Sequence, residues 1–262
     1  MKLIAITAAA LAAAITIGSV SPQQHAGPPP KAVAVVQTIA VPAPLRAAAL
    51  LDGTASRDAA RISASIDDLT PLFDRLRVSG GEIGFGRITD DSDMPLIRCY
   101  VPEPPEPPTF PAEATGNVFA NANLRKREEA ERKKYEAKRR AWEADANARI
   151  NAFIAAITPL LAAPPIAPRT DILGAIARGD LMMAEPSPFR GPAQTAIVVI
   201  TDGYHNATAA STPALRSNGQ VVIVNGIGAL GILDKLTPRP LRFESTAAAV
   251  RYITINGEPN AR

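Results

Sequence analysis

A short apolar segment that ends in a carboxylate and two hydroxyls is the feature that most constrains the fold of this chain. Residues 47–51 are all alanine or leucine, and residues 52–56 that follow are Asp-Gly-Thr-Ala-Ser. An apolar run ended by a turn signal is typical of a strand buried on both faces, as in a parallel sheet. Ligands bind such sheets at the carboxyl ends of the strands. Residues 52–56 are therefore the first candidate for a functional site.

The polar residues of this segment permit two interpretations. Asp52, Thr54 and Ser56 supply hard oxygen atoms at alternate positions, which suits Mg²⁺ or Mn²⁺. The same residue types are also common in Asx turns that cap a following helix. On this segment alone, both interpretations stay open.

Strands and helices alternate along the rest of the chain. The expected strands are 82–88, 96–101, 196–201, 221–224 and 241–244, and the expected helices are 58–76, 172–182, 230–236 and 246–255. This pattern predicts an α/β fold with a doubly wound, mostly parallel sheet and helices on both faces. Only the acidic turn 89–95 separates the first two of these strands, so we expect a hairpin that gives the sheet one antiparallel edge. The turn lacks the Gly and Glu of a calcium loop, and we expect it to be solvated.

The N-terminal residues have the composition of a targeting segment. Lys2 precedes the apolar residues 3–17, as in a secretory signal, but Pro22 would hinder cleavage, so a retained membrane anchor is the alternative. We therefore expect a signal peptide or a membrane tether over residues 1–21 and a Pro/Ala-rich linker over 22–42. Either way, we expect the protein outside the cytoplasm, in the periplasm or cell envelope or secreted.

Charge and rare residues exclude several classes of function. The net charge is +3, and residues 125–149 hold ten Lys or Arg against six Asp or Glu, so this segment carries +4 and the rest of the chain −1. We therefore expect no nucleic-acid partner. Cys99, the single cysteine, excludes an internal disulfide and lies in an apolar run, which predicts a small buried side chain. Two histidines, His25 and His205, are too few for a typical zinc site.

Residues 102–146 are expected to interrupt the domain as an insertion. A proline-rich lead should be extended, and the charged residues 124–149 should form a helix with favourable i to i+4 pairs. After Leu124, its only large apolar residues are Tyr135 and Trp142, seven positions apart, which is too thin a seam for a stable coiled coil. A solvated helix that projects from the domain is favoured over an arm that binds a partner or a membrane. The clean apolar face that starts at Ile150 marks the return to the core.

Two later residues complete a known pattern. Thr170 precedes the helix 172–182, and Asp202 stands in a Thr-Asp-Gly turn after the strand 196–201. With the Asp52 loop, this order resembles the von Willebrand factor type A (VWA) domain family, whose metal-ion-dependent adhesion site combines a D-x-S-x-S loop, a later threonine and an aspartate in a T-D-G turn. The resemblance covers about residues 43–256, apart from the insertion, and implies a VWA-like domain at 43–258.

The resemblance implies a function. One Mg²⁺ or Mn²⁺ would be bound by Asp52, Thr54, Ser56, Thr170 and Asp202, and a protein partner would add a carboxylate to the ion. This chain departs from the family pattern in two places: Thr54 replaces a serine, and Pro168 and Arg169 stand where glycines are usual. The implied role is adhesion or assembly without chemistry.

Two alternatives remain open at this point. An envelope scaffold protein with a degenerate metal site would account for the charged helix and the proline-rich linkers. A haloacid dehalogenase-like phosphohydrolase would account for the Asp-Gly-Thr loop, but Leu50 stands at the position of the nucleophile and cannot attack phosphate. We therefore expect the protein not to be an enzyme.

Overall fold

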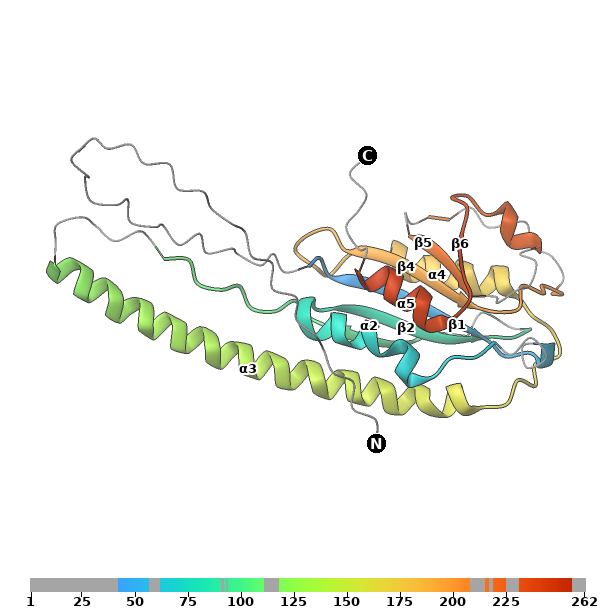
Figure 1. Ribbon diagram of the computed structural model, residues 1–262, viewed down its shortest axis with the longest axis horizontal. Helices are drawn as coiled ribbons and strands as arrows, with labels where there is room; N and C mark the ends of the chain where they lie inside the picture. The colour runs from blue at the N-terminus through green and yellow to red at the C-terminus, as the bar shows by residue number, and fades with distance from the viewer. Residues whose placement is uncertain are drawn as a thin grey trace, which may run out of the picture. The chain divides into compact units, whose positions relative to one another are not determined.

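A six-stranded mixed sheet with the order β3-β2-β1-β4-β5-β6 organises the computed structural model (Figure 1). The structure describes residues 42–56, 62–90, 92, 94–110, 118–207, 215–216, 219–224 and 231–255. The strands are β1 (Leu45–Asp52), β2 (Gly81–Ile88), β3 (Ile97–Val101), β4 (Gln194–Ile200), β5 (Gln220–Val224) and β6 (Leu241–Phe243). Neighbouring strands are parallel except β2 and β3. The predicted α/β sheet with one antiparallel edge is confirmed.

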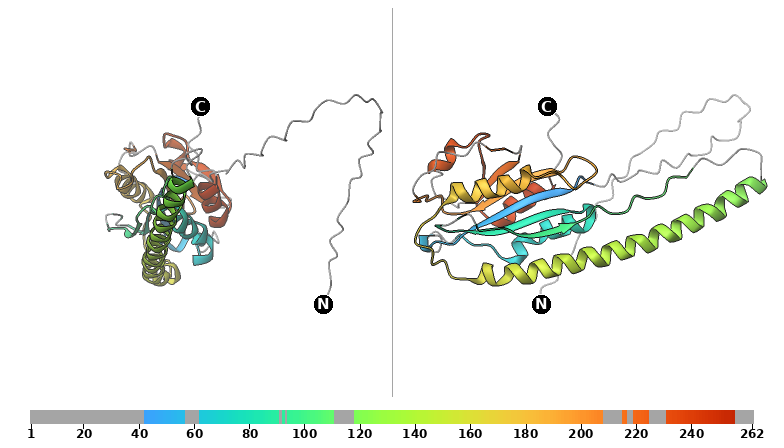
Figure 2. Two further views of the ribbon diagram at one scale, coloured as in Figure 1. Left: turned by 90° about the vertical axis from the view of Figure 1, so that its left-hand side faces the viewer. Right: turned by 180° about the vertical axis from the view of Figure 1, so that it is seen from behind.

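Helices cover both faces of this sheet (Figures 1 and 2). They are α2 (Ile66–Ser79), α3 (Val118–Ala162), α4 (Ile172–Ala184), the 3₁₀ helix η1 (Gly231–Lys235) and α5 (Thr246–Ile255). Odd-numbered residues of β1 pack in the core beneath α2, α3 and α5, whereas Ala48 and Leu50 pack in the core beneath α4. Burial of both faces explains why the strand is apolar at every position from 47 to 51.

The N-terminal signal or anchor segment and the linker as far as residue 41 lie outside the described residues. Within the part of the chain that is described, no helix is both long enough and apolar enough to cross a membrane.

The helix α2 begins later than the sequence pattern predicts. Residues 62–65 are not helical, so the prediction of one helix from residue 58 is wrong. A capping box defines the true start: the Ser65 hydroxyl accepts from the Asp68 amide at 3.2 Å, and the Asp68 carboxylate accepts from the Ser65 amide at 2.8 Å. These reciprocal bonds satisfy two backbone groups that the helix itself leaves unpaired.

The charged helix α3 joins the core earlier than its charge pattern suggests. It is one continuous helix of 45 residues, mostly exposed over 121–141. Contact with the core begins at Trp142, which is 8 % exposed, and continues through Ala146 to Ile150. The Trp142 indole N–H donates to the Pro102 carbonyl at 2.8 Å, so this hydrogen bond connects the helix to its own lead segment.

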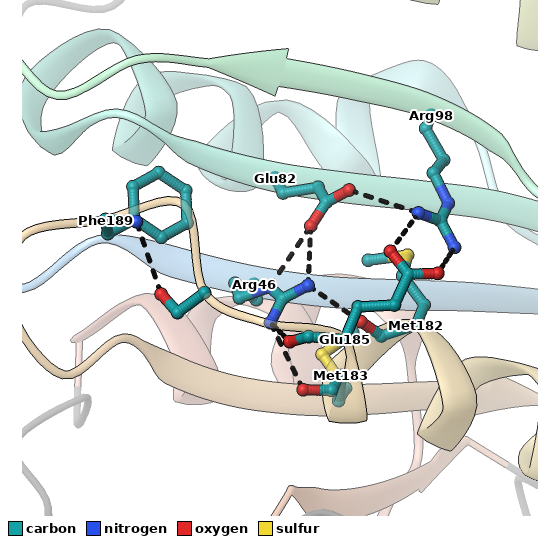
Figure 3. A network of polar contacts seen from close by, with 8 residues as sticks. Arg46, Glu82, Arg98, Met182, Met183, Glu185 and Phe189 are labelled. Atoms are coloured by element: carbon teal, nitrogen blue, oxygen red, sulfur yellow. Dashed lines mark hydrogen bonds and ion pairs between the residues drawn. The ribbon is translucent and has the colours of Figure 1, made fainter.

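Figure 3 shows a buried ion pair between Arg46 and Glu82. Arg46 is near the start of β1, whereas Asp52 of the candidate site is its last residue. Arg46 is 3 % exposed, and its guanidinium donates to Glu82, its neighbour in register on β2, at 3.0 and 3.1 Å. The same guanidinium donates to three carbonyls at the end of α4: those of Met182 at 2.7 Å, Met183 at 3.2 Å and Glu185 at 2.9 Å. Arg46 therefore closes a helix C-terminus, where a positive charge is favourable.

The buried Cys99 leads to a first testable prediction. Burial raises the pKa of this thiol to about 11, against the opposing effect of the Arg149 charge. Because the thiolate is the reactive species, we expect modification by a thiol reagent at pH 7 to be roughly a hundredfold slower or more in the folded protein than in denaturant. Kinetics with dithionitrobenzoate would measure this difference. Rapid, complete labelling of the native protein would contradict it.

Candidate metal centre

The carboxyl ends of the central strands meet at one edge of the sheet. Asp52 is in register with Ile88 of β2, and β4 runs beside β1 as far as Ile200. From β1, the chain adds β2 and β3 on one side and then β4, β5 and β6 on the other, so the topological switch point of the sheet lies between β1 and β4. Ligands bind open α/β sheets at such switch points. The Gly53 amide donates to the Ile88 carbonyl at 2.8 Å, and a Cβ at Gly53 would lie 2.9 Å from that oxygen. Only glycine allows this close crossing of the two strand ends.

Asp52 is the centre of the candidate site. It is fully buried, and its Oδ1 accepts from the Thr54 amide at 2.9 Å and the Thr54 hydroxyl at 2.7 Å. Its Oδ2 accepts from the Thr201 hydroxyl at 2.7 Å. Burial raises the pKa of Asp52, the hydrogen bonds from Thr201 and Thr54 oppose that effect, and the nearby charge of Asp202 raises the pKa further. A cation beside Asp52 would favour its charged form.

Thr54 and Ser56 lie beside Asp52, as the sequence predicts. The two hydroxyl oxygens are 3.1 Å apart, with Thr54 buried and Ser56 exposed. Thr54 also forms an isolated parallel bridge with Ala167, whose amide donates to the Gly53 carbonyl at 2.9 Å. The loop before α4 is therefore attached to the candidate site.

Thr170 is buried in that same loop, but it is not the cap of α4. The N-cap is Asp171, whose Oδ1 accepts from the Gly174 amide at 3.0 Å. The Thr170 amide donates to Asn206 Oδ1 at 2.6 Å, and the Thr170 carbonyl accepts from the Asn206 amide at 3.3 Å. The hydrogen bonds of the described residues thus join Thr170 to the loop after β4 and not directly to Asp52.

Asp202 lies in the loop after β4, as the sequence predicts. Its Oδ1 accepts from the Tyr204 amide at 2.8 Å, and its charge acts on Asp52. Gly203 has a φ of 84°, a conformation that favours glycine, and its amide donates to the Thr201 hydroxyl at 3.1 Å. Sequence reasoning missed Thr201 as a site residue, although it is the threonine of the Thr-Asp-Gly turn.

The acidic turn between β2 and β3 is also hydrogen-bonded to the loops at this edge of the sheet. Ser92 is buried, and its hydroxyl donates to the Asp171 carbonyl at 2.8 Å. The prediction of a solvated turn is therefore wrong for Ser92, while Asp90 is exposed as expected. Asp91 and Asp93 lie outside the described residues.

The oxygen atoms at this edge of the sheet suit a hard cation whose ligands include hydroxyl groups. Among the residues that the structure describes, no group of three His, Cys, Asp or Glu side chains is placed to hold a metal ion. From the residues that the structure describes, Asp52 Oδ2 accepts one hydrogen bond, and a carboxylate oxygen has a second lone pair that can ligate an ion or a water bound to it. With two carboxylates and neighbouring hydroxyls, the residues fit Mg²⁺ or Mn²⁺ better than a softer metal.

Comparisons with known proteins assign no family to this chain. No family model matches the sequence, and no curated protein matches it. Among solved structures, the chain is similar to an aerotolerance-related membrane protein from Bacteroides fragilis NCTC 9343, crystallised with multiple mutations to serines. The identity is 15 %, the match covers 69 % of this chain and 66 % of the other, and the TM-score is 0.27. A likeness this weak supports no conclusion about function.

Proposed function

We propose that this protein is a VWA-like envelope protein that binds one Mg²⁺ or Mn²⁺ and, through the ion, a carboxylate of a protein partner. Asp52, Thr54, Ser56, Thr170 and Asp202 would hold the ion. The observation that carries the proposal is the buried Asp52 carboxylate, whose burial raises its pKa at the edge where the candidate loops meet. The apolar residues 3–17 support a location outside the cytoplasm.

The coordination number of the ion, not its charge, leaves a position for a partner carboxylate. Asp52 and Asp202 together neutralise a divalent ion, and the hydroxyls add neutral oxygen ligands. Such an ion retains affinity for a further oxygen, and an acidic side chain of a partner supplies one. Leu50, at the nucleophile position of haloacid dehalogenase-like phosphatases, is apolar and fully buried, so the proposal includes no chemistry at this site.

One observation favours a second candidate function, an envelope scaffold whose metal site is degenerate. The Asp52 carboxylate accepts three hydrogen bonds from protein groups, two from Thr54 and one from Thr201. A buried carboxylate satisfied in this way can be purely structural.

Metal-dependent stability separates these candidates. With Mg²⁺ or Mn²⁺ in hundredfold excess over the dissociation constant, the free energy of unfolding should rise by about 2.7 kcal/mol. Asp52→Asn should abolish that rise, because it removes the charge and keeps the shape of the side chain. Thermal denaturation with and without metal measures both effects.

The exposed Asp74 offers a matched control for this test. Asp74→Ala should leave the metal response unchanged. A full response in Asp52→Asn would show that the ligands are assigned wrongly, and no response in the unaltered protein would favour the scaffold.

A further inference from the structure

Three large apolar side chains stand exposed on the loops that surround the candidate metal centre. Met94 is 64 % exposed, Ile166 is 80 % exposed and Tyr204 is 66 % exposed. Met94 follows β2, Ile166 precedes α4 and Tyr204 follows β4. We call these three residues the apolar collar.

Hydrogen bonds connect the three loops of the collar. The Asp171 amide donates to the Thr89 carbonyl at 2.8 Å, which joins the loop of Ile166 to the loop of Met94. The Asn206–Thr170 bonds join the loop of Ile166 to the loop of Tyr204. The collar residues therefore belong to one continuous rim, although they come from distant parts of the sequence.

The other exposed large apolar residues of the described chain lie elsewhere. Val78, Leu181 and Ile255 are in the last turns of α2, α4 and α5. The end of α4 contacts Arg46 at the start of β1, which is the opposite end of the strand from Asp52. Isolated exposed apolar residues are common on protein surfaces, but three around one candidate site are not explained by folding.

Prolines and a hydrogen bond restrain the backbone of the loop that contains Ile166. Its sequence from 163 to 169 is Ala-Pro-Pro-Ile-Ala-Pro-Arg, and proline fixes φ at three of these positions. Ala167 is held by the Gly53 carbonyl, so Ile166 projects from a restrained backbone. A restrained loop loses little conformational entropy when a partner binds. The exposed Arg169 adds a positive charge to the same loop.

We propose that the apolar collar selects the partner: Met94, Ile166 and Tyr204 contact large apolar side chains that flank the partner's metal-bound carboxylate. The occupant is thus an acidic segment of a protein with apolar residues on both sides of the acid. The exposed Arg169 beside Ile166 offers a positive charge to such an acidic segment, and Met and Tyr are residue types enriched in protein interfaces. This inference rests on the proposed function and adds the partner's chemistry to it.

A randomised displayed peptide library, selected on the full chain in Mg²⁺, provides the probe. Enriched peptides should carry Asp or Glu between large apolar residues. A synthetic peptide of the enriched sequence should bind the triple variant Met94→Ser, Ile166→Ser, Tyr204→Ser at least tenfold more weakly than the unaltered chain. Mn²⁺ affinity of that variant, measured by calorimetry, should stay within twofold, because no collar residue is a proposed ligand.

The matched control replaces the exposed apolar residues outside the collar by serine: Val78→Ser, Leu181→Ser and Ile255→Ser. Its peptide affinity should stay within twofold of the unaltered chain. Enriched acidic peptides without apolar residues, or full peptide affinity in the collar variant, would overturn the inference and leave the metal function standing.

Other occupants of the collar have distinct signatures. Self-association that the collar variant abolishes, seen by sedimentation, would assign the collar to a second copy of the chain and overturn the inference. Binding to phosphatidylglycerol vesicles that requires the collar would assign it to a membrane, with the same consequence. Failure of the unaltered chain to bind Mn²⁺ would instead overturn the proposed function and this inference together.

Discussion

Replacing Arg46 by methionine is expected to lower the free energy of unfolding by about 3–5 kcal/mol, the usual cost of breaking a buried ion pair. Methionine fills much of the same volume, so the loss is mainly electrostatic. Glu82 would keep a buried charge, and its remaining ion-pair partner among the described residues would be Arg98, at 3.7 Å. Three carbonyls at the end of α4 would also lose their donor. Urea denaturation would measure the change.

The pair between Arg98 and Glu185 is a matched control for this prediction. Its closest atoms are 2.6 Å apart, but the side chains are 38 % and 43 % exposed. Arg98→Met should therefore cost about 1 kcal/mol or less. The double variant Arg46→Met, Glu82→Met should recover part of the loss, because it leaves no uncompensated charge. Equal losses in Arg46→Met and Arg98→Met would show that the Arg46 network contributes little.

Most of the sheet could be predicted because its signals are local. The apolar runs at 47–51 and 196–200 each identify a strand, a Gly-Gly break and an acidic turn bound the strand at 82–88, and the alternation of strands with helices identifies the fold class. Arg46 was missed because its partners are distant in sequence: Glu82 becomes its neighbour only through the register of β1 and β2. No local pattern reveals that an arginine at the start of a strand will be buried.

The start of α2 was mispredicted for a different reason. Ser65 and Asp68 have the spacing of a capping box, but an aspartate replaces the usual glutamate or glutamine. The apolar periodicity, which runs back to Ile62, concealed this signal. Ile62 is buried even though it lies outside the helix.

The candidate site could be predicted where its residues are close in sequence. Asp52, Thr54 and Ser56 follow one strand end, so their contacts are nearly dictated by the turn. Contacts between different loops were harder to predict from the sequence. Thr201 was passed over in favour of its neighbour Asp202. The N-cap of α4 lies at Asp171 because of the backbone of its loop, which hydrogen bonds from neighbouring loops fix in place.

Trp142→Ala is expected to lower the free energy of unfolding by about 3–5 kcal/mol, because truncating a buried tryptophan leaves a cavity. The indole packs in the core beneath α3 and donates to the Pro102 carbonyl. Trp142→Phe should keep most of the packing and lose the hydrogen bond, at a cost of about 1 kcal/mol. Chemical denaturation monitored by circular dichroism would compare the variants.

Tyr135 on the same helix provides the control for Trp142. It is seven residues earlier and is only partly buried, so Tyr135→Ala should change the free energy of unfolding by about 0.5 kcal/mol or less. The charge pattern of residues 125–149 predicts a solvated helix at both positions. The sequence does not distinguish the two positions because the buried helix face contains an alanine. Trp142, Ala146 and Ile150 are spaced by four and share that face, but Ala146 adds little to an apolar pattern. Equal, small effects at Trp142 and Tyr135 would mean that the helix is solvated up to Ile150.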